Sequence, residues 1–534
     1  MMRWFLTCML GVVIPTSALA QAKPFGDAKV SAAVDAEINA ALGAAKLRPV
    51  GPASDAEFGR RAYLDLLGRI PTTDEAKAYF EDKNADKERR LVEHLLAHAE
   101  MPAYWCDVLH GWMNGKSPDP GLGFKEFREY LRASLAENKP WNKLARELLL
   151  PIDGPTQPAA FFLGVRLRTS DKEERLDGMT VAVARTFFGV RMECAKCHDH
   201  PYVDEWKQHH YYGLASFLTR TELSIVNAKP TLRERDAGEV VFQNRKRESF
   251  KAELRFLDDK IFAEPKRDKK QTKKEKTELP TIADFSPRKT LADYAFVPGN
   301  PYFKRAVVNR LWKELMGVGL VEPVDQIHSG NAPSHPKMFE LLSEDFAAHG
   351  FDLKRLIANI MQTEAYRRGS IWPDKERPME KQYAVFNLRP LTPEQLAVSL
   401  ATATGYTEVV KAQKKKGELR AELEKDYKLF IEHYEDENDR FAATTGQALF
   451  MTFNKTTQKY LQPVAGNLSA RLIKTNDAES FGQEVYLSVL SRLPTRTEAD
   501  AVSKYLQTTG VPRDQLVRDV VWALLNSTEF RFVH

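Results

Sequence analysis

Two cysteines and a histidine stand close together at Cys194, Cys197 and His198. In a c-type cytochrome, two thiols at this spacing add to the vinyl groups of haem, and the adjacent histidine binds the iron as its proximal ligand. With four cysteines and twelve histidines in 534 residues, the C-x-x-C-H pattern arises by chance with a probability of roughly one in a thousand. The spacing therefore predicts a haem c bound at these three residues.

A haem iron has a sixth coordination position, opposite the proximal histidine. His200 lies only two residues beyond His198, which places it badly for the opposite face. We therefore expect it to support the proximal ligand without binding the iron, or to be a turn residue before Pro201. The candidates for the sixth ligand are Met192, His209, His210, His328 and His335. The sequence does not choose among them.

The same cysteines allow two other interpretations. In an oxidising compartment Cys194 and Cys197 could form a disulfide, as in an exported structural or interaction protein. They could also bind zinc together with His198 or His200 and one further ligand. Haem remains the first interpretation, and zinc is the alternative cofactor.

A second group of polar residues follows the glycine-rich turn at 316–320 and comprises Asp325, His328 and His335. Carboxylate and imidazole groups of this kind serve as general acids and bases when they line a pocket. They indicate a third function, an exported hydrolase or lyase. The sequence therefore does not decide whether the chain is an enzyme.

The N-terminus predicts export. Arg3 precedes an apolar run from Trp4 to Pro15, and the small residues of Ala18-Leu19-Ala20 follow. This is the pattern of a secretory signal peptide over residues 1–20, cleaved before Gln21. About 514 residues would remain, in the periplasm or at the cell surface. Haem c is attached after export, so this location agrees with the C-x-x-C-H interpretation.

The composition is that of a globular protein, with 43% hydrophobic and 28% charged residues and a net charge of +5. No apolar run after the signal peptide is long enough to cross a membrane. The basic run Lys266–Lys276 has no interleaved aromatic residues, so we expect a solvated loop and no nucleic-acid partner. The expected partner is a redox protein or another exported protein.

Apolar residues recur at three- and four-residue spacing along most of the chain, which predicts a mainly α, multi-helix protein with no large sheet. We expect two helical domains, at 25–221 and 300–534, joined by an irregular basic linker or insertion at 222–299. The highly charged stretch Val410–Tyr434 predicts a long solvated helix or a protruding hairpin. Predicted helices are Ala32–Leu47, Asp55–Leu67, Thr73–Asp82, Asp86–His98, Phe124–Asn138, Asn142–Leu149 and Pro301–Met316.

One internal repeat occurs once near each end of the chain. Residues 63–76 match residues 486–499, and each copy is followed by an amphipathic helix. The shared positions are turn formers and core-facing apolar residues. The repeat therefore predicts a helix–turn–helix packing module and not a catalytic site.

The chain also resembles the planctomycete cytochrome-associated exported proteins. In these a C-x-x-C-H domain of unknown function, of PSCyt type, precedes a domain of unknown function of PSD type. The first resemblance runs from about 38 to 221 and includes Cys194–Pro201 and Tyr211–Phe217; the second runs from about 300 to 534 and includes Asn309–Trp312, Pro333–Pro336 and Arg389–Leu396. The resemblance implies export and haem association, and it supplies no reaction. His210 departs from it, because an acidic residue is expected before the Tyr-Tyr-Gly segment.

Overall fold

The structure is a computed structural model that describes residues 24–115, 121–154, 156–265, 279–413, 418–434 and 444–534. The expected signal peptide and the basic run Lys266–Lys276 lie outside these residues. Within them there are 24 α-helices, and the strands form only two-stranded antiparallel sheets. The expected mainly α fold without a large sheet is confirmed.

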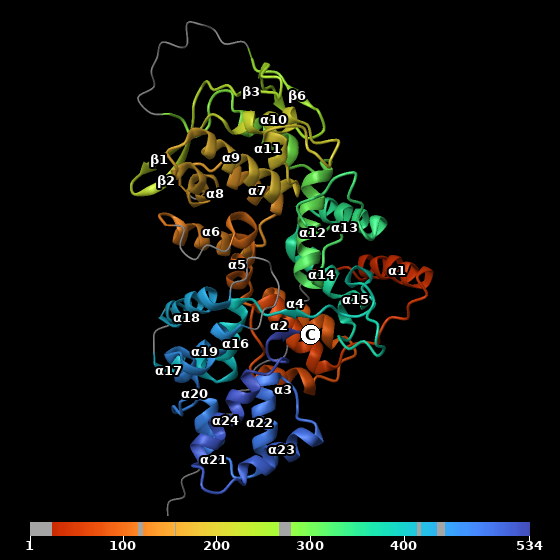
Figure 1. Ribbon diagram of the computed structural model, residues 1–534, viewed down its shortest axis with the longest axis vertical. Coiled ribbons are helices and arrows are strands. Elements are labelled where there is room, and N and C mark those ends of the chain that lie inside the picture. Colours follow the sequence, from red (N-terminus) through yellow and green to blue (C-terminus); the bar gives the residue numbers. More distant parts are fainter. Residues whose placement is uncertain (1–23, 116–120, 155, 266–278, 414–417, 435–443) are drawn as a thin grey trace, which may run out of the picture.

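The helices gather in two lobes, one above the other in Figure 1. The lower lobe begins with the first five helices of the chain. Helix α5 ends this series and leads upward, and α6 packs against it. These first helices are α1 (Ala28–Ala44), α2 (Asp55–Leu67), α3 (Thr73–Glu81), α4 (Lys87–Ala97) and α5 (Met101–Asn114).

The upper lobe holds the C-x-x-C-H segment. Its helices are α6 (Phe124–Ala136), α7 (Trp141–Leu149), α8 (Phe161–Gly164), α9 (Lys172–Val183), α10 (Gln208–Leu218) and α11 (Pro287–Ala295). The expected linker at 222–299 contributes α11 and three hairpins to this lobe. The hairpins pair β1 (Thr221–Val226) with β2 (Lys229–Glu234), β3 (Val241–Gln243) with β4 (Ser249–Lys251), and β5 (Leu254–Arg255) with β6 (Ile261–Phe262). Because β5 packs on α10, this segment forms part of the lobe around the motif.

The chain then returns downward through α12 and completes the lower lobe (Figure 1). The elements of this half are α12 (Pro301–Met316), α13 (Pro336–Ala348), α14 (Leu353–Met361), α15 (Glu364–Arg367), β7 (Arg389–Pro390), α16 (Pro393–Ala403), α17 (Tyr406–Gln413), α18 (Glu418–Tyr434), α19 (Thr445–Phe453), α20 (Lys455–Leu461), α21 (Leu468–Lys474), α22 (Ala478–Leu490), α23 (Arg496–Leu506), α24 (Arg513–Leu525) and β8 (Phe532–Val533). The short strands β7 and β8 pair with each other.

The expectation of a long solvated helix or a protruding hairpin at Val410–Tyr434 is wrong. Helix α18 packs against α16, and it buries Asp426 and Phe430. Asp426 accepts a hydrogen bond from the Tyr460 hydroxyl, so its carboxylate has a partner inside the protein. High charge density on a helix therefore did not mean that all its faces meet water.

Buried polar contacts join the N-terminal helices to the end of the chain. Arg60 donates to the carbonyl oxygens of Val489 and Phe530 at 3.2 and 2.9 Å. The neighbouring Arg61 donates from Nε to the carbonyl oxygen of His534 at 3.0 Å. Both guanidinium groups are buried, so breaking these contacts would leave buried N–H donors without a partner. The two ends of the sequence thus form one packed unit.

The repeat is visible in the structure as two similar clamps. Arg69 follows the left-handed Gly68 and ion-pairs with Glu75 and Glu100; Arg492 follows the left-handed Ser491 and ion-pairs with Glu498 and Glu529. A threonine N-cap with a reciprocal glutamate begins the next helix in each copy. These local rules explain why both copies fold alike.

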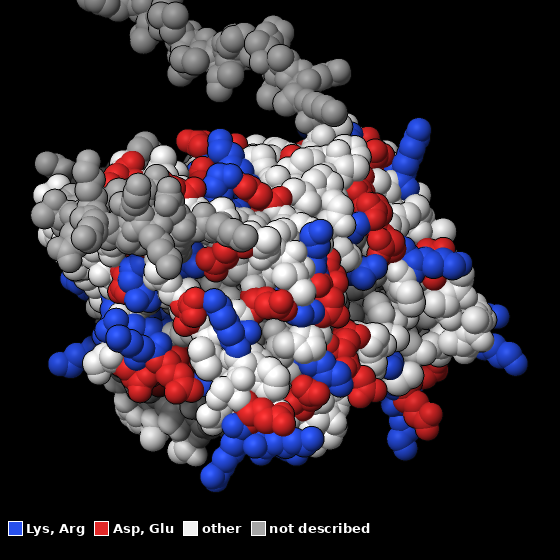
Figure 2. Space-filling view, turned by 90° about the horizontal axis from the view of Figure 1, so that it is seen from above, with Lys and Arg blue, Asp and Glu red and all other residues white. Residues whose placement is uncertain are grey.

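The face seen from above mixes charges of both signs. Figure 2, which views the molecule from above, shows Lys and Arg side chains interspersed with Asp and Glu wherever the atoms are not grey. No helix in the described part of the chain is long and apolar enough to cross a membrane.

Candidate functional site

The C-x-x-C-H segment is positioned by the end of α9. This helix continues into a single π-helical turn, Ala184–Phe188, and ends at Gly189 with φ +64°. A Cβ atom at Gly189 would lie 2.7 Å from Cδ1 of Ile327, so glycine suits both the backbone angle and the close packing. Val190 then forms a β-bridge with Gln326. The chain therefore enters the motif from a fixed position.

The two thiols lie on a 3-10 turn, Glu193–Lys196, with Cys197 as its C-terminal cap. In a 3-10 helix, side chains three residues apart lie on the same face, so Cys194 and Cys197 project together. Both are exposed and neither is in a disulfide. Met192 and Ala195 are fully buried and anchor the turn from beneath. This arrangement presents two free thiols outward on one face.

His198 has one ring nitrogen ready for a metal. Its Nδ1 lies 2.6 Å from the carbonyl oxygen of Asp199, and a carbonyl only accepts hydrogen bonds. Nδ1 must therefore carry the proton, which leaves the lone pair of a neutral ring on Nε2. A hydrogen bond from Nδ1 to a backbone carbonyl is how metal-bound histidines are usually oriented. The proton arrangement of His198 thus fits a ligand to iron or zinc.

His200 and His210 have the opposite arrangement. The backbone N–H of Tyr202 donates to Nδ1 of His200 at 3.2 Å, and that of Lys207 donates to Nδ1 of His210 at 3.0 Å. In the neutral ring the proton then lies on Nε2, so neither Nε2 is free to bind a metal without losing this contact. His200 accordingly fits the expected role of a neighbour and not a ligand.

His209, His210 and Asp259 have ligand atoms within 4.8 Å of one another, a spacing that a metal ion accepts. However, Nε2 of His210 faces Asp259 at 3.1 Å, and Arg255 donates to the same carboxylate oxygen at 2.7 Å. Burial, and then the charge of His209, lower the pKa of His210. The histidine Nε2–H and the guanidinium already satisfy this carboxylate. The cluster is best explained as a hydrogen-bonded contact between His210 of α10 and the Arg255–Asp259 ion pair of the β5–β6 hairpin.

Charged side chains tie the motif to the loop after α12. Arg185, in the π-helical turn, ion-pairs with Glu193 and lies 3.5 Å from Asp325; Arg191 lies 3.1 Å from Asp325. Asp325 is only 6% exposed, so its charge depends on these partners. The sequence did not single out Arg185 or Arg191, because their shared partner Asp325 lies more than 130 positions away in the chain.

The same loop brings His328 to the motif. Ile327 donates its backbone N–H to the carbonyl oxygen of Gly189 at 3.0 Å, and Ser329 donates to the carboxylate of Glu205 at 3.1 Å. Burial, followed by the charge of the nearby His328, lowers the pKa of His200. Nδ1 of His328 is buried with no hydrogen-bond partner among the residues described. Among the histidines outside the motif, His328 thus lies near His200 and also has a ring nitrogen without a hydrogen bond.

The other candidates for a sixth ligand are engaged elsewhere. Met192 is fully buried beneath the 3-10 turn. His209 and His210 face Asp259. His335 lies at the start of α13, where its ring packs 5.4 Å from that of Tyr383 and its Nδ1 is 3.1 Å from the Ser334 hydroxyl.

The proposed acid–base group is not assembled. Asp325 is held by arginines, His328 lies near His200, and His335 packs on Tyr383. Within the residues described, no hydrogen bond joins any two of the three. The geometry gives the hydrolase or lyase interpretation no support.

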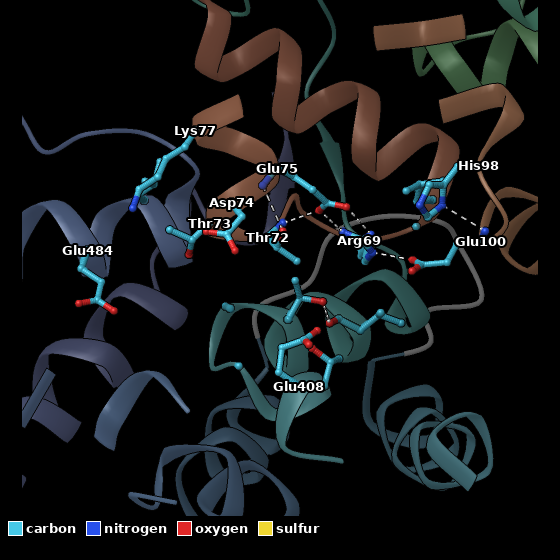
Figure 3. A pocket seen from close by; sticks show the side chains of 18 of the residues that line it. Arg69, Thr72, Thr73, Asp74, Glu75, Lys77, His98, Glu100, Glu408 and Glu484 are labelled. Carbon is cyan, nitrogen blue, oxygen red and sulfur yellow. Dashed lines mark hydrogen bonds and ion pairs between the residues drawn. The ribbon is translucent and has the colours of Figure 1, made fainter. Parts of the chain in front are cut away.

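A large cleft lies away from the motif, between the two copies of the repeat. Its volume is about 1310 Å³. Figure 3 shows Arg69, Thr73, Asp74 and Lys77 on the wall formed by α3 and the preceding turn, and Glu484 and Glu408 on other walls. Sequence patterns do not reveal this cleft, because its walls come from two segments, 67–107 and 394–493, that are far apart in the chain.

The fold and this site define a mainly helical protein with an outward-facing Cys-x-x-Cys-His turn. Residues 33–223 match the PSCyt2 family, described as proteins of unknown function (DUF1549). Residues 287–436 match the PSD1 family, also proteins of unknown function (DUF1553). This order agrees with the architecture that the sequence resembles. Neither the curated proteins nor the solved structures yield a match.

Proposed function

We propose that this protein is an exported electron-transfer or redox-sensing protein that carries one haem c on Cys194 and Cys197, with His198 as the proximal ligand. The observation that carries the proposal is the hydrogen bond from His198 Nδ1 to the Asp199 carbonyl, beside two free thiols on one face. When bound, the haem supplies a one-electron iron couple. The family matches establish only two regions of unknown function, so the haem is our inference.

Each residue has a defined task in this proposal. The thiols of Cys194 and Cys197 each add across one vinyl group, so that a sulfur–carbon bond forms and the thiol proton is transferred to the other vinyl carbon. No oxidant is consumed. Asp199 holds the His198 ring in the orientation that exposes Nε2. The exposed turn leaves the site within reach of a partner protein, as electron transfer requires.

We further propose His328 as the sixth ligand. Two backbone hydrogen bonds and a β-bridge hold its loop against the segment that carries the motif. Its buried Nδ1 has no partner in the described part of the chain, and a ligand would satisfy it or reorient the ring. His198 of the PSCyt2 region and His328 of the loop after α12 would then hold the haem together.

Haem staining tests the proposal. The full chain is produced in a bacterial periplasm together with haem-maturation machinery, and the purified protein is stained on a denaturing gel. Wild type is expected to stain, and the double variant Cys194→Ala/Cys197→Ala is not. Cys106→Ala is the matched control and should stain, because Cys106 is fully buried on α5. An unstained wild type, or stain that persists in the double variant, would contradict haem attachment.

Zinc is the second candidate, and one observation favours it. Free thiols beside an imidazole with an available Nε2 are three of the four ligands of a structural zinc site. Metal analysis of the same purified protein separates the two. One zinc per chain without haem stain, lost in the double cysteine variant, would replace the haem proposal by a Cys2His site.

A further inference from the structure

The cleft between the two repeat copies has an unusual charge. The chain as a whole has a net charge of +5. Carboxylates nevertheless outnumber basic side chains in the cleft by eight to three. The carboxylates are Asp74, Glu75, Glu81, Glu100, Asp107, Glu394, Glu408 and Glu484, and the basic residues are Arg69, Lys77 and Arg471. The sign of the cleft is thus opposite to that of the protein.

Two of these three cations are already neutralised. Arg69 lies 2.7 Å from Glu75 and 2.6 Å from Glu100, and Arg471 lies 2.7 Å from Glu484. The clamp around Arg69 recurs around Arg492, which does not line the cleft. The clamp is therefore part of the repeat's architecture and leaves no unpaired positive charge on Arg69 for an anionic ligand.

Three carboxylates of the cleft have no such partner. Asp74, Glu81 and Glu394 make no side-chain ion pair or hydrogen bond with any residue that the structure describes. Among the basic residues that line the cleft, Lys77 alone likewise makes no ion pair or hydrogen bond with the described residues. Asp74 and Glu81 are exposed and Glu394 is half-buried, and carboxylates that line one cleft repel one another. A positively charged ligand would reduce this repulsion.

One largely buried threonine has a hydroxyl that opens into the cleft without a protein partner. Thr407, on α17, is only 9% exposed and lines the cleft. Its hydroxyl makes no hydrogen bond to the residues that the structure describes. Threonines nearby on α16 do bond to their own helix, as Thr402 does to the Val398 carbonyl at 2.8 Å. Thr407 therefore offers the cleft a free hydrogen-bonding group.

The two copies of the repeat differ in how one apolar position is covered. Ile70, in the first copy, is fully buried, and its backbone N–H lies 3.3 Å from the Ser399 hydroxyl of α16. The equivalent residue of the second copy, Leu493, lines the cleft and is 57% exposed. An apolar position that one copy covers with a helix is thus open in the other. A ligand with an alkyl part would cover it.

We propose that this cleft is a binding site for an oligoamine, a ligand in which several ammonium groups are joined by alkyl segments. The ammonium groups pair with Asp74, Glu81 and Glu394, the Thr407 hydroxyl accepts a further hydrogen bond, and the alkyl segments contact Leu493. This chemistry has two sources, a free polyamine and the lysine side chains of a polypeptide. The site is separate from the C-x-x-C-H motif and does not depend on haem.

Isothermal titration of the purified full chain with spermidine, and in a second arm with a tri-lysine peptide, tests this site. Binding is expected to weaken as the salt concentration rises, since ammonium–carboxylate pairs are screened. The triple variant Asp74→Asn/Glu81→Gln/Glu394→Gln should weaken binding about tenfold or more, at a few tenths to one kcal/mol for each partly exposed pair. Thr407→Val should weaken it by a smaller factor.

The matched control is Asp500→Asn, which removes an exposed carboxylate outside the cleft. Its dissociation constant should equal that of wild type. If only one of the two probes binds, that probe identifies the source of the ammonium groups. Failure of both probes to bind, or equal affinity of wild type and the triple variant, would overturn the proposal. Circular dichroism of each variant confirms that it is folded.

Discussion

The backbone N–H of Ile327 lies 3.0 Å from the carbonyl oxygen of Gly189, and this contact joins the loop after α12 to the end of α9. The C-x-x-C-H turn begins four residues after Gly189, and His328 directly follows Ile327. The hydrogen bond therefore sets the position of a candidate axial ligand relative to the motif. Packing at Gly189 should control both stability and the site.

Replacing Gly189 by alanine is expected to destabilise the protein by about 2–3 kcal/mol, because φ is +64° there and the new Cβ would lie 2.7 Å from Ile327 Cδ1. Chemical denaturation measures the change in the free energy of unfolding. The control is Gly510→Ala, where φ is +80° but no atom lies within 4 Å of the added Cβ. The Gly510→Ala substitution should lower the free energy of unfolding by only about 1 kcal/mol. Equal costs would show that the Gly189 contact is not tight.

The clamp around Arg492, in the second copy of the repeat, predicts that the stability of the protein falls at acidic pH. Hydrogen bonding to Arg492 lowers the pKa of Glu498 from its ordinary 4.5 to about 2. Because the folded pKa is the lower one, this stabilisation is complete above pH 4.5 and is lost as the pH falls towards 2. Arg492→Met should remove about 2 kcal/mol at neutral pH, after allowance for solvent screening, and flatten the acid limb. The control Arg496→Met, at a nearby exposed position, should change neither the stability at neutral pH nor its fall at acidic pH.

His110 predicts a second pH effect, at higher pH. Burial, and then the charges of Arg128 and Arg166, lower its pKa to about 4, and its Nε2 has no partner in the described structure. The unfolded chain binds a proton near pH 6.5 that the folded chain does not, so stability should fall as the pH drops from 6.5 to 4. The loss is about 3 kcal/mol.

His110→Phe should remove this part of the pH dependence without a loss at pH 7, because the ring already packs 5.1 Å from Phe124. Urea denaturation at pH 7 and pH 5 measures it. A variant that keeps the full slope would show that other groups cause it.

His328→Ala tests the sixth ligand separately from haem attachment. The variant should still stain for haem, because both thioether bonds remain, but its absorption spectrum should change from that of a six-coordinate low-spin iron to a high-spin one. His335→Ala is the control, since that ring packs on Tyr383, and it should keep the wild-type spectrum. Stain with an unchanged spectrum in His328→Ala would reject this ligand while leaving the haem in place.

Local rules made most helices predictable. The predicted helices over Asp55–Leu67 and Pro301–Met316 have those bounds in the structure, because N-caps and a left-handed glycine mark their ends. Helix α5 was not predicted. It starts without a side-chain cap and buries the polar His110 together with its apolar face. Only Pro102 in the first turn and Gly115 after the last residue mark its ends, and its buried face is not wholly apolar.

The candidate site was predictable only in its local part. Spacing identified Cys194, Cys197 and His198, but it did not select His328 from five candidates. That choice depends on the contacts of Gly189 with Ile327 and of Glu205 with Ser329, which join residues more than 120 positions apart. Likewise, the hydrogen bond that fixes the His198 proton depends on backbone conformation and not on residue type. Long-range packing was needed for both.

The most direct test of the central claim is the mass of the proteolytic peptide that contains Cys194, Cys197 and His198, taken from protein exported in cells with haem-maturation machinery. The peptide is expected to carry the mass of one haem, with neither cysteine open to alkylation. A peptide whose two cysteines are both alkylated, with no added haem, would contradict the account.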